Sequence, residues 1–141
     1  SPLLYLSAYF EKDRDKYYQG LLNVSQKGTW EEWLIYFLTA VITQSNDAVS
    51  RSRRLIDLRE VWRKKLNQFK STSDLFQIVD HLFEKPYLSI KDVERMLKVT
   101  NRSAAQDVAK LQKIGILSLT EDKKWGRVFE AKDILEILRI N

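Results

Sequence analysis

A group of polar side chains suited to DNA recognition occurs between residues 99 and 113. Arg, Asn and Gln carry forked donors and acceptors that match base edges in the major groove, while Lys and Ser suit phosphates. With helical spacing these side chains share an outward face, and they are Asn101, Arg102, Ser103, Gln106, Lys110 and Lys113. Asp107 is expected on the same side, where its carboxylate would repel phosphate. The pattern predicts a DNA-binding helix with one unfavourable charge.

A second basic group follows in the loop between two short β-prone runs, 116–119 and 127–131. The group consists of Lys123, Lys124, Trp125 and Arg127. A hairpin loop of this composition is expected to hold the DNA backbone or to enter the minor groove. Residues 71–141 nevertheless hold 12 basic and 11 acidic residues, which is far from the strongly basic footprint of a dedicated DNA-binding domain. A surface that docks a protein therefore remains an equal alternative.

Residues able to carry out catalysis are scarce. There is one histidine, His81, in the middle of a predicted helix, where we expect it to be a half-buried packing residue. There are no cysteines, so a zinc site would need carboxylates alone. The four glycines stand apart at 20, 28, 115 and 126, which excludes a glycine-rich phosphate loop. The sequence predicts no enzyme, no bound cofactor and no metal site in this chain.

The elements that carry the polar helix follow one another in a recognisable order. Ser73, Ser89 and Thr100 can each cap a helix, giving helices from Asp74 to about Glu84, over 90–99 and from about residue 101. Ala104, Val108 and Leu111 form the buried stripe of the third helix, which Gly115 ends by admitting a positive φ. A hairpin and a last helix over 132–140 complete the order of a winged helix-turn-helix.

The first half is expected to be entirely helical. Apolar spacing predicts one helix over 3–24, closed by Gly28, and Thr29 with Glu32 forms a capping box for the next helix. No proline or glycine follows until Pro86, so we expect one very long helix, or two with a small break near 44–47. Its apolar stripe should pack on the first helix. The aromatic residues Trp30, Trp33, Tyr36 and Phe37 would form core or, alternatively, an exposed patch for a partner.

Composition sets the remaining limits. The 141 residues are 44% hydrophobic and 30% charged with a net charge of +5, which is the balance of a globular protein. We expect no membrane span and no signal peptide, and we expect the protein in the cytoplasm. The fold class is mainly α: a helical segment with a long helix over 1–70, then a winged helix-turn-helix domain with a small β-hairpin over 71–141, expected to fold independently. Residues 51–70 hold eight basic and two acidic residues, which predicts either a polyanion-binding face or a solvated one.

Two stretches of the first half have a distinctive pattern, Leu-Tyr-Leu-Ser-Ala-Tyr-Phe-Glu from residue 4 and Gly-Thr-Trp-Glu-Glu-Trp from residue 28. With them, residues 1–41 closely resemble the end of the Fic domain in bacterial Fic family proteins. The family form Leu-Tyr-Leu-Ser-x-Tyr-Phe-Glu-x-x-Arg-x-x-Tyr-Tyr is matched by residues 4–18. The following form, Gly-x-Trp-x-x-Trp and then Phe-Leu, is matched by residues 28–38, with Asp13 and Tyr36 at variable places. The winged-helix tail after a long helix is also similar to the C-terminal region of that family. The resemblance covers nearly the whole chain, and its first half is the specific part.

The resemblance implies a function for a longer parent protein. Fic proteins transfer AMP from ATP to hydroxyl side chains of target proteins, through a loop that begins His-Pro-Phe and contains Gly-Asn-Gly-Arg. This loop is absent here, so no catalytic residue carries over, and ATP and magnesium are implied only for the parent. The chain is expected to be a C-terminal, regulatory or DNA-binding module of such a protein. The alternative is an interaction module that dimerises or docks a protein target.

Overall fold

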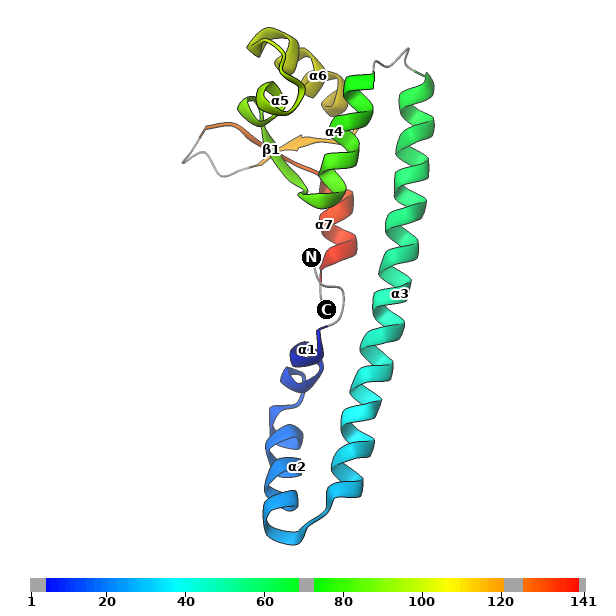
Figure 1. Ribbon diagram of the computed structural model, residues 1–141, viewed down its shortest axis with the longest axis vertical. Helices are drawn as coiled ribbons and strands as arrows, with labels where there is room; N and C mark the ends of the chain where they lie inside the picture. The colour runs from blue at the N-terminus through cyan, green and yellow to red at the C-terminus, as the bar shows by residue number, and fades with distance from the viewer. Residues whose placement is uncertain (1–4, 69–72, 121–125, 140–141) are drawn as a thin grey trace. The chain divides into compact units, whose positions relative to one another are not determined.

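The computed structural model describes residues 5–68, 73–120 and 126–139, and their elements are mainly helices with one small antiparallel sheet (Figure 1). The chain divides into two compact units, Ser1–Arg53 and Arg54–Arg139, called here the N-terminal unit and the C-terminal unit. The mainly α fold class predicted from the sequence is confirmed.

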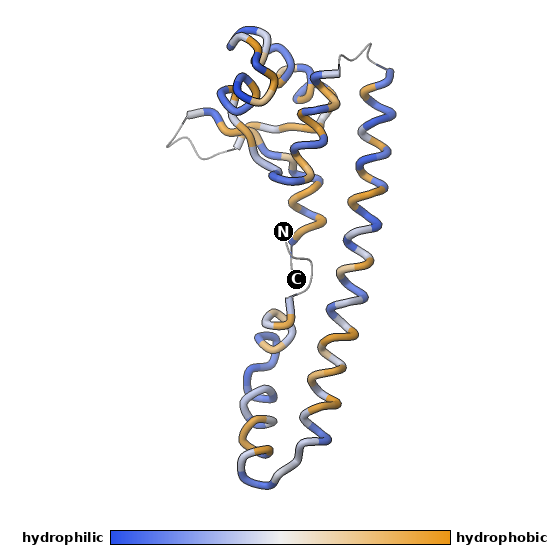
Figure 2. Tube along the Cα trace, viewed as in Figure 1, coloured by the Kyte–Doolittle hydropathy of each residue, from blue (hydrophilic) through white to orange (hydrophobic). Residues whose placement is uncertain are grey.

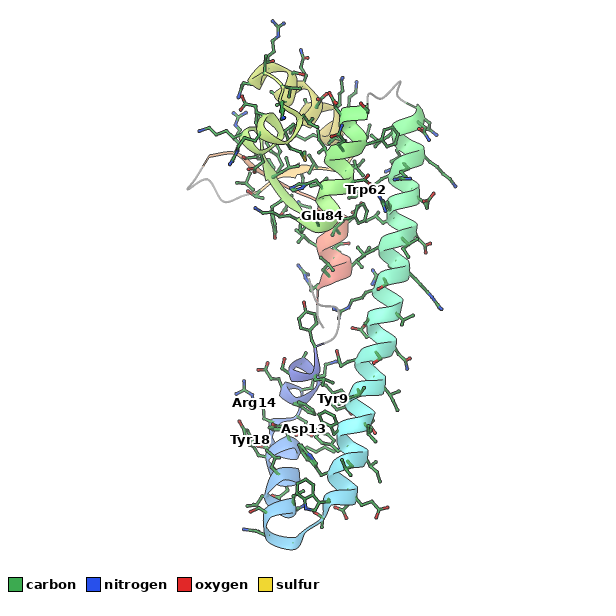
Figure 3. The ribbon with its side chains drawn as sticks, in the orientation of Figure 1. Tyr9, Asp13, Arg14, Tyr18, Trp62 and Glu84 are labelled. Carbon is green, nitrogen blue, oxygen red and sulfur yellow. The ribbon has the colours of Figure 1, made fainter. Side chains whose placement is uncertain are left out.

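The N-terminal unit begins with two short helices where the sequence predicted one. Helix α1 spans Leu6–Glu11 and helix α2 spans Arg14–Lys27. Asp13 lies between them with φ −143°, and its carboxylate accepts a hydrogen bond of 3.0 Å from the backbone N–H of Lys16 (Figure 3). The prediction of a single helix over 3–24 is therefore wrong, because Asp13 acts as an N-cap and starts a new helix.

The predicted boundary between α2 and the long helix is confirmed. Gly28 ends α2 with φ 66°, and its N–H donates to the carbonyl oxygen of Val24. Helix α3 then spans Trp30–Gln68, 39 residues without the small break considered near 44–47. Since α3 starts in the N-terminal unit and ends in the C-terminal unit, one helix contributes residues to both.

Aromatic rings join the short helices to the first turns of α3. Phe10 lies 4.9 Å from Tyr17 and 5.7 Å from Tyr36, measured between ring centroids. Tyr17 in turn lies 5.6 Å from Trp33. Trp30, however, leaves 61% of its surface exposed. The predicted aromatic set is thus split between internal packing and an exposed surface.

The C-terminal unit has the element order of a winged helix-turn-helix. Its elements are α4 (Ser73–Glu84), β1 (Tyr87–Ser89), α5 (Ile90–Leu97), α6 (Asn101–Lys113), β2 (Ser118–Leu119), β3 (Val128–Glu130) and α7 (Lys132–Leu138). The sheet order is β1-β3-β2, with Leu88 opposite Phe129. Strand β1 was not predicted, because three residues after Pro86 are too few to show a period of two.

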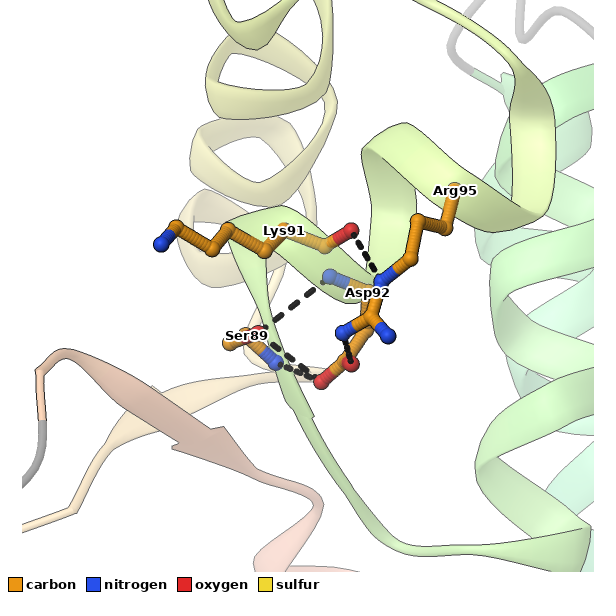
Figure 4. Close-up of polar contacts among 4 residues, drawn as sticks. All are labelled: Ser89, Lys91, Asp92 and Arg95. Carbon is orange, nitrogen blue, oxygen red and sulfur yellow. Dashed lines mark hydrogen bonds and ion pairs between the residues drawn. The ribbon is translucent and has the colours of Figure 1, made fainter.

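The predicted cap of α5 forms a reciprocal pair of hydrogen bonds (Figure 4). The backbone N–H of Ser89 donates to the Asp92 carboxylate at 2.7 Å, and the N–H of Asp92 donates to the Ser89 hydroxyl at 3.2 Å. The backbone hydrogen bond from Ser89 is the main cause that lowers the pKa of Asp92, and the nearby Arg95 adds to it. This capping box fixes where α5 begins and therefore where the turn before α6 falls.

The core of the C-terminal unit includes the last turns of α3. Trp62 and Leu66 expose 1% and 0% of their surfaces, and Trp62 points toward α4, with its ring 5.3 Å from Phe83 (Figure 3). Arg59 also donates to the Asp80 carboxylate at 2.7 Å. The unit therefore begins at Arg54 rather than at the predicted residue 71, because these side chains of α3 complete its core.

Candidate nucleic-acid interface

The turn between α5 and α6 brings the two helices into close contact. Lys98 ends α5 in the left-handed conformation with φ 54°, and the Thr100 hydroxyl accepts from the N–H of Ser103, as predicted for the cap of α6. Ala104 is fully buried. Because its side chain is a single methyl group, α6 can approach its neighbours closely, and α5 and α6 form a helix-turn-helix.

Three of the predicted base or phosphate contacts lie exposed on α6 and are free of polar partners among the described residues: Arg102, Gln106 and Lys113. On a helix, residues 102, 106 and 113 fall at spacings of four and seven, so they share one face. An unpaired guanidinium and an unpaired amide are what base recognition requires, because both can still form two hydrogen bonds to one base.

The other predicted residues of α6 are partly occupied. The Asn101 amide donates to the Glu94 carboxylate of α5 at 3.2 Å. Ser103 is half-buried, and the ammonium of Lys110 lies 3.7 Å from a carboxylate oxygen of Asp107. To bind DNA, Asn101 would have to give up its hydrogen bond to Glu94, and Lys110 its ion pair with Asp107. The Glu94–Asn101 contact was not predicted, because it depends on how closely α5 and α6 pack.

Asp107 does not lie on the outward face, and this prediction is wrong. Asp107 exposes only 6% of its surface, since it lies three residues after Ala104 and four before Leu111 and so joins the buried stripe. Burial raises the pKa of its carboxyl group, the nearby Asp74 raises it further, and Lys110 opposes both. The expected repulsion of phosphate from this face is therefore reduced.

The predicted wing is described only in part. Lys123, Lys124 and Trp125 lie outside the described residues. Arg127 is exposed, directly after Gly126 with φ 82° and directly before β3. A cation at this place could reach a phosphate, and it adds one positive charge next to the sheet.

Much of the basic run in α3 is used inside the protein. Arg51 exposes 6% of its surface and forms an ion pair of 2.6 Å with Asp47. Arg59 and Arg63 both approach Asp80, at 2.7 and 3.8 Å. These contacts favour a structural role for three of the arginines, so the run has fewer free cations for a polyanion than its composition suggests.

Metal-binding clusters and membrane-spanning helices were both sought among the described residues. Within ranges 5–68, 73–120 and 126–139, no three His, Cys, Asp or Glu side chains gather in a group that could hold a metal ion. His81 is half-buried on α4 and lines an open hollow of about 340 Å³ together with Lys85, Asp92 and Arg95. None of the helices in the described part combines the length and the apolar character needed to cross a bilayer.

The winged helix alone does not determine function, because unrelated functions use the same fold. No family model matches the chain. Any functional assignment must therefore come from the residues themselves, and the free side chains on α6 are the most specific group among those described.

Proposed function

We propose that this chain is a DNA-binding, regulatory C-terminal module of a Fic family protein adenylyltransferase, in the cytoplasm, without the catalytic loop. The observation that carries the DNA-binding part is the row of exposed, unpartnered side chains on α6, Arg102, Gln106 and Lys113. In a helix-turn-helix the second helix enters the major groove, with its N-terminal residues nearest the bases. Arg102 and Gln106 would therefore read bases, and Lys113 would contact phosphate.

Two features of α6 support this role over a purely structural one. The cap at Thr100 fixes the first turn, so Arg102 has a defined position from which to reach a base. The inward position of Asp107 leaves the row without the carboxylate that we expected beside it. Arg127, Lys123 and Lys124 would add backbone contacts from the wing, with Trp125 beside them.

The proposed relation to Fic proteins rests on the resemblance of residues 1–41 and on the surface of the N-terminal unit. That unit leaves many large apolar side chains at least 36% exposed: Tyr18, Leu21, Leu22, Trp30, Leu34, Ile35, Phe37, Leu38, Ile42 and Val49. Apolar surface on this scale is expected where helices belong to a larger assembly. A longer parent would supply the loop that binds ATP and magnesium, so this chain by itself should transfer no AMP.

A second candidate is a winged helix that docks a protein target or a second copy of the chain. Tyr87 and Leu119 favour it, because they lie on the two edge strands β1 and β2 and expose 40% and 46% of their surfaces. Exposed apolar groups on strand edges suit pairing with another chain. In this case the exposed side chains of α6 would contact the protein partner and not DNA.

Titration of duplex DNA by fluorescence anisotropy at two salt concentrations distinguishes the two candidates. The duplex is first selected from a random library with the wild-type chain. Arg102→Ala should weaken binding to the selected site by about 1–3 kcal/mol and flatten sequence preference. Lys113→Ala and Lys124→Ala should weaken all sequences alike and lower the salt slope by about one unit.

Lys132→Ala is the matched control, because it removes one exposed positive charge from α7 and not from α6. Equal effects of Arg102→Ala and Lys132→Ala, or no salt-dependent binding at all, would reject the DNA-binding proposal. The Fic part is tested separately by incubating the chain with labelled ATP and cell extract. A labelled band that persists after repurification would contradict the absence of AMP transfer.

A further inference from the structure

One face of α3 carries a β-branched residue at every seventh position. Ile35, Ile42, Val49 and Ile56 expose 59%, 61%, 51% and 63% of their surfaces. Figure 2 shows hydrophobic residues recurring along α3. A repeat of seven keeps a column of side chains on one side of a helix over many turns, which is the pattern of a helix that pairs with another helix.

This column points away from the side of α3 that packs within the N-terminal unit. Ala40, Gln44 and Arg51 mark the packed side, since each exposes 6% of its surface or less. At 100° per residue, Ile42 and Val49 lie roughly opposite those three. The packing of the described residues therefore leaves the column uncovered.

The neighbouring column of α3 indicates how two copies would fit. Leu38, Ser45 and Ser52 follow one another at the same spacing of seven, three residues after Ile35, Ile42 and Val49. Two parallel copies would stack serine on serine and isoleucine on isoleucine. In two antiparallel copies, the column of Ile35, Ile42 and Val49 on one helix lies against the column of Leu38, Ser45 and Ser52 on the other. This follows because turning one helix end to end exchanges the left and right positions of its two columns. The isoleucines of one copy then meet the serines of the other.

All the resulting pairs fall in one register. Ile42 faces Ser45 of the second copy, Ile35 faces its Ser52, and Val49 faces its Leu38. Each of these pairs is centred on the same point, between residues 43 and 44. A single two-fold axis through that point therefore generates these three layers and their symmetry mates at once, as an isologous interface requires. Ile56 lies beyond them, because in this register it would face Glu31 of the second copy.

Charge supports the same register. Glu32 and Arg53 lie beside the columns, and both are exposed without an ion pair among the described residues. In the antiparallel register, Glu32 of each copy comes next to Arg53 of the other, which gives two symmetric ion pairs. A parallel pair would bring together no opposite charges from these two positions.

We propose that α3 associates with α3 of a second copy of this chain as an antiparallel, two-fold coiled coil. Covering the exposed halves of four apolar side chains on each copy, Ile35, Leu38, Ile42 and Val49, removes on the order of 800 Å² of surface, which is the size of a weak, transient interface. The dimer is therefore reversible. It uses a surface separate from α6 and does not rest on the proposed DNA binding.

Cross-linking tests the orientation, because the chain has no cysteine of its own. Ile35→Cys and Ser52→Cys are prepared as separate variants and oxidised alone and mixed. The antiparallel register predicts a disulfide-linked dimer in the mixture and little in either variant alone. Dimers from each variant alone, with none gained on mixing, would overturn the proposal in favour of a parallel pair.

Sedimentation equilibrium tests the surface and the charges. Ile42→Lys should weaken the dimer at least about a hundredfold, whereas the control Val61→Lys, at an exposed position of α3 outside both columns, should leave it unchanged. Glu32→Arg and Arg53→Glu should each weaken it about tenfold, and the double variant should restore it. A monomer at every concentration, an equal effect of Val61→Lys, or no restoration would each overturn the proposal. Circular dichroism confirms that each variant remains helical.

Discussion

The two units of this protein are stabilised in different ways. The C-terminal unit has a continuous core to which α3, α4, α5, α6, β3 and α7 all contribute. In the described part of the N-terminal unit, Ala40 is the buried apolar side chain, and the other buried side chains are the polar Gln44 and Arg51. Well-formed helices therefore do not imply a buried core, because the helices of the N-terminal unit are joined by aromatic contacts that remain half-exposed.

Local signals do not reveal this difference. Asp13 caps α2 in one unit and Ser89 caps α5 in the other, each by accepting a hydrogen bond from the N–H three residues later. Both caps have the residue types that favour helix starts. What separates the units is how much apolar surface each helix covers, and this depends on tertiary contacts.

The largest expected effect comes from removing the end of α3 from the C-terminal unit. A chain of residues 54–141 should melt cooperatively, whereas a chain of residues 71–141 lacks Trp62 and Leu66. The loss of two fully buried large side chains costs on the order of 5 kcal/mol, which equals the whole stability of many small domains. Thermal melts followed by circular dichroism compare the two. Equal melting temperatures would restore the boundary at residue 71 that the sequence predicted.

A single substitution in the same core should have the next largest effect. Trp62→Ala should lower the free energy of unfolding of the C-terminal unit by about 3–5 kcal/mol, because it opens a cavity against Phe83. Its neighbour provides the control, since Val61 is 49% exposed and Val61→Ala should change stability by about 0.5 kcal/mol or less. Urea unfolding measures both. Similar midpoints for the two variants would mean that α3 does not belong to this core.

Sequence patterns predicted the helices of the C-terminal unit well, because its signals are local and agree with one another. Ser89, Thr100 and Gly115 each specify a helix end through their own backbone or side-chain chemistry. The long α3 was also predicted, since no glycine or proline interrupts it. These features need no knowledge of what packs on what.

The failures lie where a residue has two roles that sequence alone cannot separate. Asp13 lies inside the single helix predicted over 3–24, but its carboxylate caps α2 and starts a new helix there. Asp107 is expected on the outward face of α6, but its spacing from Ala104 and Leu111 places it in the buried stripe. The domain boundary was set at a polar segment, because nothing local shows that Trp62 packs beyond it. For the candidate site, the type of residue was predictable, but its burial and its partners were not.

The two caps offer a smaller test of the comparison. Ser89→Ala should lower the free energy of unfolding of the C-terminal unit by about 0.5–2 kcal/mol, because α5 is part of a cooperative core. Asp13→Ala removes the same type of bond from a unit without such a core. It should reduce helix content at low temperature without shifting the main transition. A shift of that transition equal to the one caused by Ser89→Ala would show that both units unfold together.

The smallest expected effect is on the pH dependence of stability, to which Asp107 and Asp92 of the C-terminal unit should contribute in opposite directions. The pKa of Asp107 is raised, mainly by burial, above its usual value of 3.8. Between pH 3.8 and the raised pKa, the folded state holds more protons than the unfolded state, so the stability contributed by this group falls as pH rises. Asp107→Asn cannot lose that proton. The variant should match the wild type in acid and gain stability over it as pH rises to neutral.

Asp92 should behave in the opposite sense, because the hydrogen bond from the Ser89 backbone N–H lowers its pKa below 3.8. Its carboxylate contributes stability above the unfolded pKa, and that contribution is lost as pH falls through the lowered folded pKa. Asp92→Asn should therefore be less stable than the wild type at neutral pH and approach it in acid. Urea unfolding of both variants from acid to neutral pH gives two difference curves of opposite sign. Curves of the same sign would mean that the attraction of Lys110 offsets the effect of burial on the pKa of Asp107. The Asp107 carboxylate would then be fully charged at neutral pH and would repel phosphate, as the sequence analysis expected.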